Sequence, residues 1–472
     1  MRIVPLFFLL ALPLASGVAA EIRPLVQQQL VAPDRLSGAL AVPITGALIE
    51  QLVREAGTNH PALLAAAARV QAARHQVAGV RRWEDPMFTL GYAVTSSRGF
   101  KMSEEGDLAY GLEQKLPLWG KPRSARQVAE AELAVAGANA DFKRRQVRGL
   151  IARAIYPLAL SERVAAILRE DLEWSETMVD LTLQRYRLGT VLQSDWLRMQ
   201  NERAKRTDQL RTEILQRDQD GAALNRLLRR DIRSPWPSLR LPEVAAPVAY
   251  TPALVALALQ NDARVALLRS EIAQANAQAE LVRRQRYPDV SVGIEGRQYS
   301  GDAGFREGFF TLKMNLPWGN AEKYRADHRR EQSRVKAAEL ELADYELTVR
   351  EELHHLVQRI DIARRQAVLY RDQIIPRAEQ AITAAYAAWE TQRGMINDLL
   401  DLRRQVLEGR LLFARAVTEQ HQLISELIYY YGVGDQQVAT VRQVAPMRAP
   451  GAASPPPAAP AAPRTTPVPR HH

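Results

Sequence analysis

Two kinds of hydrophobic periodicity alternate along the chain. From about residue 49 to residue 82, apolar side chains recur every three or four positions, which is typical of an amphipathic helix. Two runs of strict alternation follow, at about 86–95 and 108–117, and each predicts a strand with one apolar and one polar face. Helical periodicity then resumes. The pattern predicts a helix, two strands and a further long helical stretch.

The same order recurs about 200 residues later, with strands predicted at about 288–299 and 308–317. Pro86 and Pro288 open the two hairpins, and Pro117 and Pro317 close them. Two similar units at nearly equal spacing predict an internal duplication.

This duplication divides the chain into segments. The predicted segments are a first repeat at 47–233, a proline-rich linker at 234–252 and a second repeat at 253–435.

The helices after each hairpin are predicted to be very long. In the second repeat, apolar positions from Val335 to Ile374 are spaced by threes and fours, with one slip near Val349, which predicts a coiled-coil seam. A helix over about 322–391 would be about 100 Å long, and Pro376 should kink it. Such a helix needs neighbours along its whole length. The fold class is therefore mainly α with a small β part.

The two ends of the chain differ from the repeats. Residues 1–20 carry Arg2, an apolar run and then small residues ending Val18-Ala19-Ala20, which predicts a secretory signal peptide. Residues 21–46 read as an N-terminal extended segment, and the Pro/Ala-rich tail at 436–472 as disordered. The protein is expected to be exported.

Composition removes several classes of function. The 472 residues include no cysteine, which excludes disulfides, thiolate metal sites, cysteine nucleophiles and a lipid on an N-terminal cysteine. The net charge of +10 is scattered, and export argues against a nucleic-acid partner. His354 and His355 point about 100° apart on a helix, a poor arrangement for chelation. We find no phosphate loop, HExxH motif or Ser/His/Asp set, and we expect no enzyme, cofactor or metal site.

The four predicted strands indicate a membrane protein. In an exported chain, strands of about ten residues with one apolar face match those of a transmembrane β-barrel. Four strands cannot close a barrel, and open edges are intolerable in lipid. A trimer would supply twelve strands and a dimer eight. The alternative is a pair of hairpins packed on a soluble sheet.

Short motifs in both halves resemble one known family. They are the strand endings Leu116-Pro117-Leu118-Trp119-Gly120 and Leu316-Pro317-Trp318-Gly319, Tyr186-Arg187-Leu188-Gly189 with Asp195 nine residues after the tyrosine, and Trp389 with Asp398 nine residues later. Their order over about 45–435 resembles the outer-membrane efflux channel (TolC) family. The Leu-Trp-Gly variants and Pro376-Arg377-Ala378-Glu379 look most like its heavy-metal branch.

The resemblance implies a homotrimer with a twelve-stranded β-barrel in the outer membrane and a long α-helical barrel across the periplasm. It also implies a periplasmic adaptor (membrane fusion) protein and an inner-membrane pump as partners. The channel would be a passive exit duct for metal ions or small toxic compounds, between which the sequence does not choose. Two other readings stay open: a periplasmic coiled-coil adaptor or scaffold protein, and a helical-bundle metalloenzyme.

The resemblance also implies a constriction at the periplasmic tip. Asp398 and Asp401 match aspartates that line it in three copies, and their spacing of three puts both on one helix face. Such a ring attracts cations, so a multivalent cation should impede flow. Without the resemblance, these residues read as a solvated acidic turn.

Further residues match closing contacts between neighbouring helix pairs. They are Asp195 with Tyr186 nearby, and Trp389 where an aromatic side chain usually reaches that aspartate. Where the best-known member of the family has an arginine that pairs with the aspartate, this chain has Gly394, with Arg393 adjacent. The closed state is therefore expected to be held more weakly or by other contacts.

Overall fold

The computed structural model describes residues 41–94, 106–299, 305–391 and 393–434. The signal peptide expected at 1–20, most of the extended segment at 21–46 and the tail at 436–472 lie outside the described residues. Among the helices that are described, each is too short or too polar to cross a membrane.

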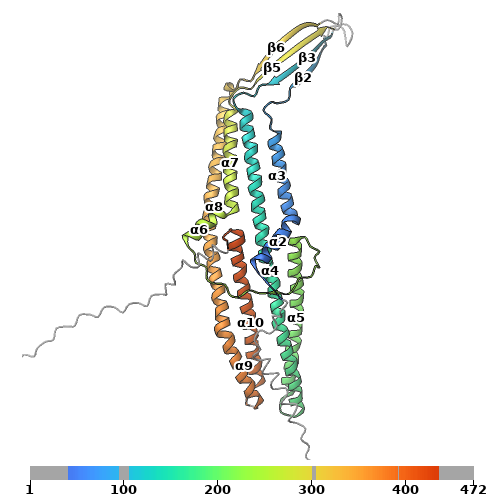
Figure 1. The fold of residues 1–472 in the computed structure, drawn as a ribbon, viewed down its shortest axis with the longest axis vertical. Helices are drawn as coiled ribbons and strands as arrows, with labels where there is room; N and C mark the ends of the chain where they lie inside the picture. Colours follow the sequence, from blue (N-terminus) through green and yellow to red (C-terminus); the bar gives the residue numbers. More distant parts are fainter. Residues whose placement is uncertain (1–40, 95–105, 300–304, 392, 435–472) are drawn as a thin grey trace, which may run out of the picture.

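The described chain is elongated, with a small sheet at one end and long helices running away from it (Figure 1). Up to residue 233, the described chain contains β1 (Val42–Pro43), α2 (Gly46–Asn59), α3 (Pro61–Gly79), β2 (Met87–Val94), β3 (Gly106–Lys115), α4 (Lys121–Arg187) and α5 (Gln193–Leu228). The rest contains β4 (Leu239–Arg240), α6 (Pro252–Asn261), α7 (Ala263–Arg284), β5 (Val290–Tyr299), β6 (Phe305–Met314), the 3-10 helix η1 (Pro317–Asn320), α8 (Ala321–Leu369), the π-helical turn η2 (Tyr370–Ile374), α9 (Ile375–Glu390), α10 (Ile396–Ser425) and the π-helical turn η3 (Glu426–Tyr430).

The sheet joins the two repeats. Its strands lie in the order β2-β3-β5-β6, and all neighbours are antiparallel. The second strand of each hairpin lies earlier than the sequence predicts, at 106–115 rather than 108–117 and at 305–314 rather than 308–317. Pro117 and Pro317 explain the earlier ends, because proline donates no hydrogen bond and restricts the residue before it.

The first predicted helix, at about 49–82, is in fact two helices. His60 has an extended backbone (φ −69°, ψ 120°) between α2 and α3, and its ring nitrogen accepts a hydrogen bond from the backbone N–H of Ala62. Pro61 is the first residue of α3. Proline disfavours the helical conformation at the preceding residue, which explains the break at His60. The apolar periodicity continues across this break and therefore does not reveal it.

The two repeats connect their sheet to the next helix differently. In the first, Trp119 (φ 59°) and Gly120 (φ 71°) both adopt left-handed conformations before the 67-residue α4 begins. In the second, the 3-10 helix η1 leads directly into α8. The repeats therefore share an element order without sharing their junction geometry.

The long helix of the second repeat is interrupted near the predicted proline. The π-helical turn η2 lies between α8 and α9, directly before Pro376. Because Pro376 cannot donate to the carbonyl four residues earlier, a local change of helical pitch is expected there. The predicted seam is buried from Val349 to Ala367, whereas Val335 and Leu342 before it and Tyr370 and Ile374 after it are only half-buried.

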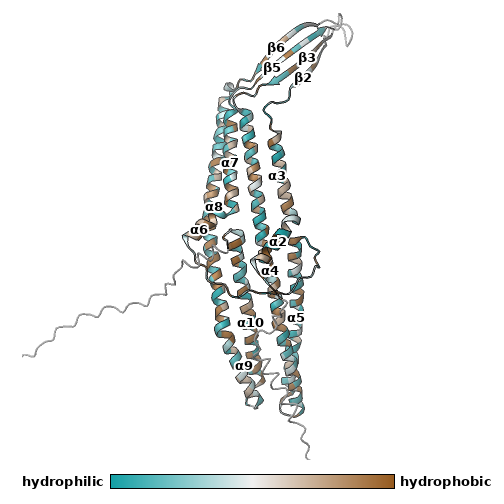
Figure 2. Ribbon diagram, viewed as in Figure 1, coloured by the Kyte–Doolittle hydropathy of each residue, from teal (hydrophilic) through white to brown (hydrophobic). Residues whose placement is uncertain are grey.

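Hydrophobic and hydrophilic residues are interspersed along the long helices (Figure 2), and the buried apolar side chains gather into separate clusters. One cluster around Ile151, Ile155 and Leu224 joins α4, α5 and α2. A second, around Leu353 and Leu427, joins α8 to the end of α10. The third lies near the far ends of the helices and contains Trp174, Met178, Met199, Ile382, Tyr386, Trp389 and Leu399. The core follows the length of the molecule.

The proline-rich segment at 234–252, expected to be a linker, is fixed to the helices. Its β4 pairs in parallel with β1, so that the two shortest strands link the N-terminal part to the strap between the repeats. The side-chain amide of Gln420 in α10 both donates to and accepts from the backbone of Ala245, at 2.9 and 3.0 Å. We call residues 234–252 the strap.

The left-handed glycine at the β3–α4 junction should resist substitution. A Cβ on Gly120 would lie 2.8 Å from Nη1 of Arg284, and the positive φ adds backbone strain. We expect Gly120→Ala to destabilise the protein by about 1 kcal/mol or more. Gly137→Ala is the matched control, since Gly137 lies inside α4 with nothing within 4 Å of its Cβ position. Thermal unfolding in detergent should show a lower midpoint for the first variant and an equal or higher one for the second. An equal fall in the unfolding midpoint for both variants would contradict a special requirement for glycine at position 120.

Candidate functional site

One face of the sheet is apolar and exposed. Phe88, Leu112, Ile294 and Phe310 lie directly opposite one another across all four strands. They are 66%, 49%, 66% and 76% exposed. Leu90, Tyr92, Leu108, Leu312 and Met314 extend the same face. An exposed apolar surface of this extent marks a site of contact with another apolar phase or partner.

The opposite face of the sheet is polar and carries its own ion pairs. Nζ of Lys313 on β6 lies 2.7 Å from a carboxylate oxygen of Glu113 on β3 and 3.9 Å from one of Glu295 on β5. The Arg297 guanidinium lies over the ring of Phe309. The two faces therefore differ in the way the alternating pattern predicts.

The two outer strands of the sheet have free edges. Within the described residues, β2 pairs only with β3, and β6 pairs only with β5. Each of these strands therefore presents backbone N–H and C=O groups that no strand of the described chain satisfies.

At the other end of the molecule, two helical turns lie side by side. α4 ends and α5 begins at one turn, and α9 ends and α10 begins at the other. Nη1 of Arg185 donates to the backbone carbonyl of Trp389 at 3.1 Å, and Nη1 of Arg198 donates to Oδ1 of Asn397 at 2.8 Å. We call these two turns the tip.

Asp398 and Asp401, which the sequence singles out, lie in the first two turns of α10. Both are exposed, and the side chain of Asp401 is 68% exposed with Nη1 of Arg404 at 3.2 Å. Their neighbours Ile396, Leu399 and Leu400 are buried, so the carboxylates occupy the solvent side of the helix. The structure places them together at the tip.

The other predicted tip residues have defined partners within the chain. Oδ1 of Asp195, at the start of α5, lies 3.6 Å from Nη1 of Arg198, and the ring of Tyr186 stacks on Trp196. Trp389 is buried, and the Arg185 guanidinium lies 3.9 Å from its ring centre. Burial lowers the pKa of Arg185. A contact of Trp389 with Asp195, which the family resemblance implies, stays a prediction.

The structure gives a reason for the glycine at position 394. A Cβ there would lie 3.1 Å from the backbone nitrogen of Trp389 and 3.2 Å from Ala388. The backbone N–H groups of Arg393 and Gly394 both donate to the carbonyl of Ala388, and the side chain of Arg393 is exposed. The turn is thus too tight for a large side chain at 394 without a local shift. Arg185 and Arg198, which sequence reasoning missed, supply cations here from the first repeat.

A buried ionic cluster, also missed, joins three helices above the tip. Nε of Arg206 on α5 and Nε of Arg403 on α10 each lie 2.6 Å from a different oxygen of Asp171 on α4. All three residues are buried, and the Arg403 guanidinium also lies 4.9 Å from the ring centre of Trp174. Both carboxylate oxygens of Asp171 are therefore paired.

Glu202 continues this cluster toward the surface. Its carboxylate pairs with Arg404 and lies 3.5 Å from Nη2 of Arg206. Burial by itself raises the pKa of Glu202, but the hydrogen bond from Arg404 and the nearby positive charges outweigh it and hold that pKa below its usual range. Glu202 therefore stays ionised at neutral pH and ties α5 to α10.

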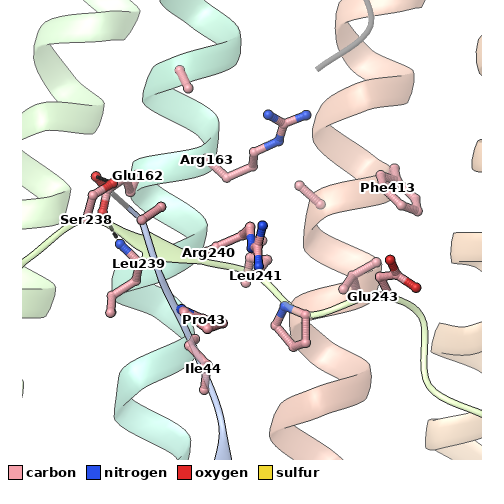
Figure 3. Close-up of a pocket in the computed structure, with 15 residues that line it drawn as sticks. Pro43, Ile44, Glu162, Arg163, Ser238, Leu239, Arg240, Leu241, Glu243 and Phe413 are labelled. Carbon is pink, nitrogen blue, oxygen red and sulfur yellow. Dashed lines mark hydrogen bonds between the residues drawn. The ribbon is translucent and has the colours of Figure 1, made fainter. Parts of the chain in front are cut away.

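The largest cavity that we describe lies under the strap (Figure 3). It has a volume of about 520 Å³ and lies between α4, α10 and residues 238–243. Oγ of Ser238 and the backbone N–H of Leu239 donate to the two oxygens of Glu162, at 2.6 and 3.0 Å. This carboxylate is occupied in holding the strap. Among the described residues, no group of three or more His, Asp or Glu side chains is placed to bind a metal ion.

Comparisons with known proteins agree with this geometry. A family model described as outer membrane efflux protein matches residues 52–228 and 254–432, about three quarters of the chain, once in each repeat. No curated protein sequence matches.

Several solved structures share the fold. VceC, an outer membrane protein of Vibrio cholerae, is 20% identical with a TM-score of 0.69, and the match covers 82% of this chain and 96% of VceC. The CmeC outer membrane channel of Campylobacter jejuni is 16% identical with a TM-score of 0.69, covering 84% and 90%. The MtrE outer membrane channel of Neisseria gonorrhoeae is 16% identical with a TM-score of 0.63, covering 81% and 88%.

The buried aspartate should be essential to stability. In Asp171→Ala, the guanidinium groups of Arg206 and Arg403 stay buried without their carboxylate, so we expect a loss of about 3 kcal/mol or more. Asp141→Ala is the control on the same helix, because its exposed pair with Arg144 contributes at most about 0.5 kcal/mol. Denaturant unfolding in detergent measures both. A similar small loss for the two variants would show that the buried cluster is dispensable.

Proposed function

Because the chain belongs to the outer membrane efflux protein family, we propose that it is the outer-membrane channel of a tripartite efflux system and that it acts as a passive exit duct. In this proposal, three copies share one twelve-stranded β-barrel, and their helices continue it as a tunnel across the periplasm. A periplasmic adaptor protein and an inner-membrane pump would be its partners.

The observation that carries the proposal is the sheet, with its apolar face and its two free edges. Lipid would solvate the row from Phe88 to Phe310, while the face with Lys313 and Glu113 would line the lumen. Unpaired edges are not tolerated in hydrocarbon, so β6 of one copy would pair with β2 of the next. Three copies supply twelve strands, an even number within the range of known barrels. A soluble adaptor or scaffold would have no use for this face.

The arrangement of the helices also supports a closed ring of three copies. α3, α4, α7 and α8 contact one another in the order of the strands that they adjoin. α8 is an outer helix of this wall and carries Leu340 and Leu347, each 60% exposed. A neighbouring copy would cover the free flank of α8 with its α3. The same interface between copies would then close both the β-barrel and the ring of helices.

The tip is proposed to be the constriction. Three copies would bring six carboxylates from Asp398 and Asp401 around one opening, and their mutual repulsion would favour a bound cation. Asp195 and Trp389 would make closing contacts between neighbouring helix pairs. Within each copy, Arg185 and Arg198 hold the two turns together.

The proposed cargo is metal ions or small toxic compounds. A duct of this kind contacts its cargo loosely, and selection would occur at the pump.

The assignment of the two sheet faces can be tested by neighbouring substitutions. Phe310→Arg places a charge in lipid, which costs about 2–4 kcal/mol near the bilayer centre, so we expect loss of trimers from the outer membrane. Thr311→Arg adds the same side chain on the lumen face and should still assemble. Heat-modified gel mobility of membrane fractions measures the trimer. Normal assembly of Phe310→Arg would oppose membrane insertion of this face.

The acidic tip can be tested in planar bilayers. We expect Asp398→Ala/Asp401→Ala channels to lose cation selectivity and block by multivalent cations, because the six carboxylates are gone. Asp361→Ala removes an exposed carboxylate of α8 away from the tip and controls for a general change of charge. Unchanged selectivity and block in the double variant would refute the ring, whereas absence of any wild-type channel would refute the proposed function itself.

A further inference from the structure

A second pocket lies where the sheet meets the helices of the second repeat. It has a volume of about 310 Å³ and lies between the end of α7 and the start of α8. Its lining includes Arg286, Tyr287, Trp318, Tyr324, Arg325 and His328. Nothing in the proposed conduction path uses these residues.

The pocket continues the apolar outer face of the sheet. Leu316 has the same strand parity as Phe310, Leu312 and Met314 and is 58% exposed. Trp318, two residues on, is 63% exposed and lines the pocket. Tryptophan and tyrosine are favoured at the membrane–water boundary. The pocket therefore lies at headgroup level, with the apolar band directly beyond it.

The pocket carries unbalanced positive charge. Among the described residues, Arg286 has no carboxylate partner. Its Nη2 donates to the Tyr287 hydroxyl at 3.1 Å, and its guanidinium lies 5.1 Å from that ring centre. Within the described part of the chain, the one carboxylate that pairs with Arg325 is that of Glu322, whose side chain is 85% exposed. Arg283, also in the lining, shares Glu280 with Arg284. Lipid phosphate would meet several cations in this groove.

Two further observations fit an anionic ligand. The hydrogen bond from Arg286, and then the charges of Arg286, Arg283 and Arg284, lower the pKa of Tyr287, which reports a positive local potential. Nδ1 of His328 is buried and lacks a hydrogen-bond partner among the described residues. A ligand oxygen in the pocket could satisfy this nitrogen.

We propose that this pocket binds the phosphate of an anionic glycerophospholipid in the periplasmic leaflet of the outer membrane. The inference rests on the proposed function, because it needs the sheet to be in lipid. Arg286 and Arg325 contact the phosphate, and the acyl chains lie along Trp318 and Leu316 toward the outer face of the sheet. Free phosphate would use the arginines but not the adjacent aromatic and apolar surface.

Lipid titration of the purified trimer tests the site. Native mass spectrometry in detergent counts phosphatidylglycerol and phosphatidylcholine bound from equimolar mixtures. We expect up to three tightly bound phosphatidylglycerol molecules per wild-type trimer. Arg286→Gln/Arg325→Gln should weaken their binding by about tenfold to thirtyfold, given about fivefold for each arginine. Arg329→Gln, which removes an exposed arginine one turn along α8, should bind as wild type.

The other outcomes are distinguishable. Equal phosphatidylglycerol binding by wild type and the double variant would overturn the site. So would a lack of preference over phosphatidylcholine. Displacement of the lipid by millimolar inorganic phosphate, with no lipid preference, would assign the pocket to free anions instead. Channel formation by the same samples in planar bilayers tests the proposed function separately, and intact trimers on gels exclude a folding defect.

Discussion

The free edges of β2 and β6 impose the constraint on which the rest of the structure depends. In hydrocarbon, each backbone N–H or C=O without a partner costs several kcal/mol, so an open four-stranded sheet cannot be a membrane-embedded unit. The apolar row from Phe88 to Phe310 makes water an equally poor solvent for the same sheet. In the proposed trimer, pairing between copies would satisfy both demands. Because each strand adjoins one of the long helices, the same pairing would also set the positions of the helices.

The contacts near the tip fall into two groups of very different strength. Asp171, Arg206 and Arg403 are buried, and they join α4, α5 and α10 by short ion pairs in a region of low dielectric. Nearer the opening, single hydrogen bonds from Arg185 and Arg198 link the two turns, and the acidic residues are exposed. This arrangement separates a fixed collar of helices from a more weakly held end. In the proposed duct, this division would let the tip open while the wall stays closed.

How far the sequence predicts the structure depends on whether the information is local. The two faces of the sheet follow from a period of two, and the register between strands confirms the sides assigned to Phe88, Leu112, Ile294 and Phe310. The break at His60–Pro61 was missed because apolar spacing continues across it. β1 and β4 have only two residues each, too few to produce a periodic signal. Asp171 and Arg403 are separated by 232 residues, so no local pattern could pair them.

The duplicated repeats are not equivalent, and the difference lies where a tunnel would need it. α4 runs for 67 residues without a change of helix type, whereas the matching helix of the second repeat is divided by η2. At that division, α10 lies close to the start of α9: a Cβ on Gly409 would lie 3.2 Å from Cγ1 of Ile375. The absence of a side chain at Gly409 therefore lets α10 lie against the π-helical turn and the start of α9.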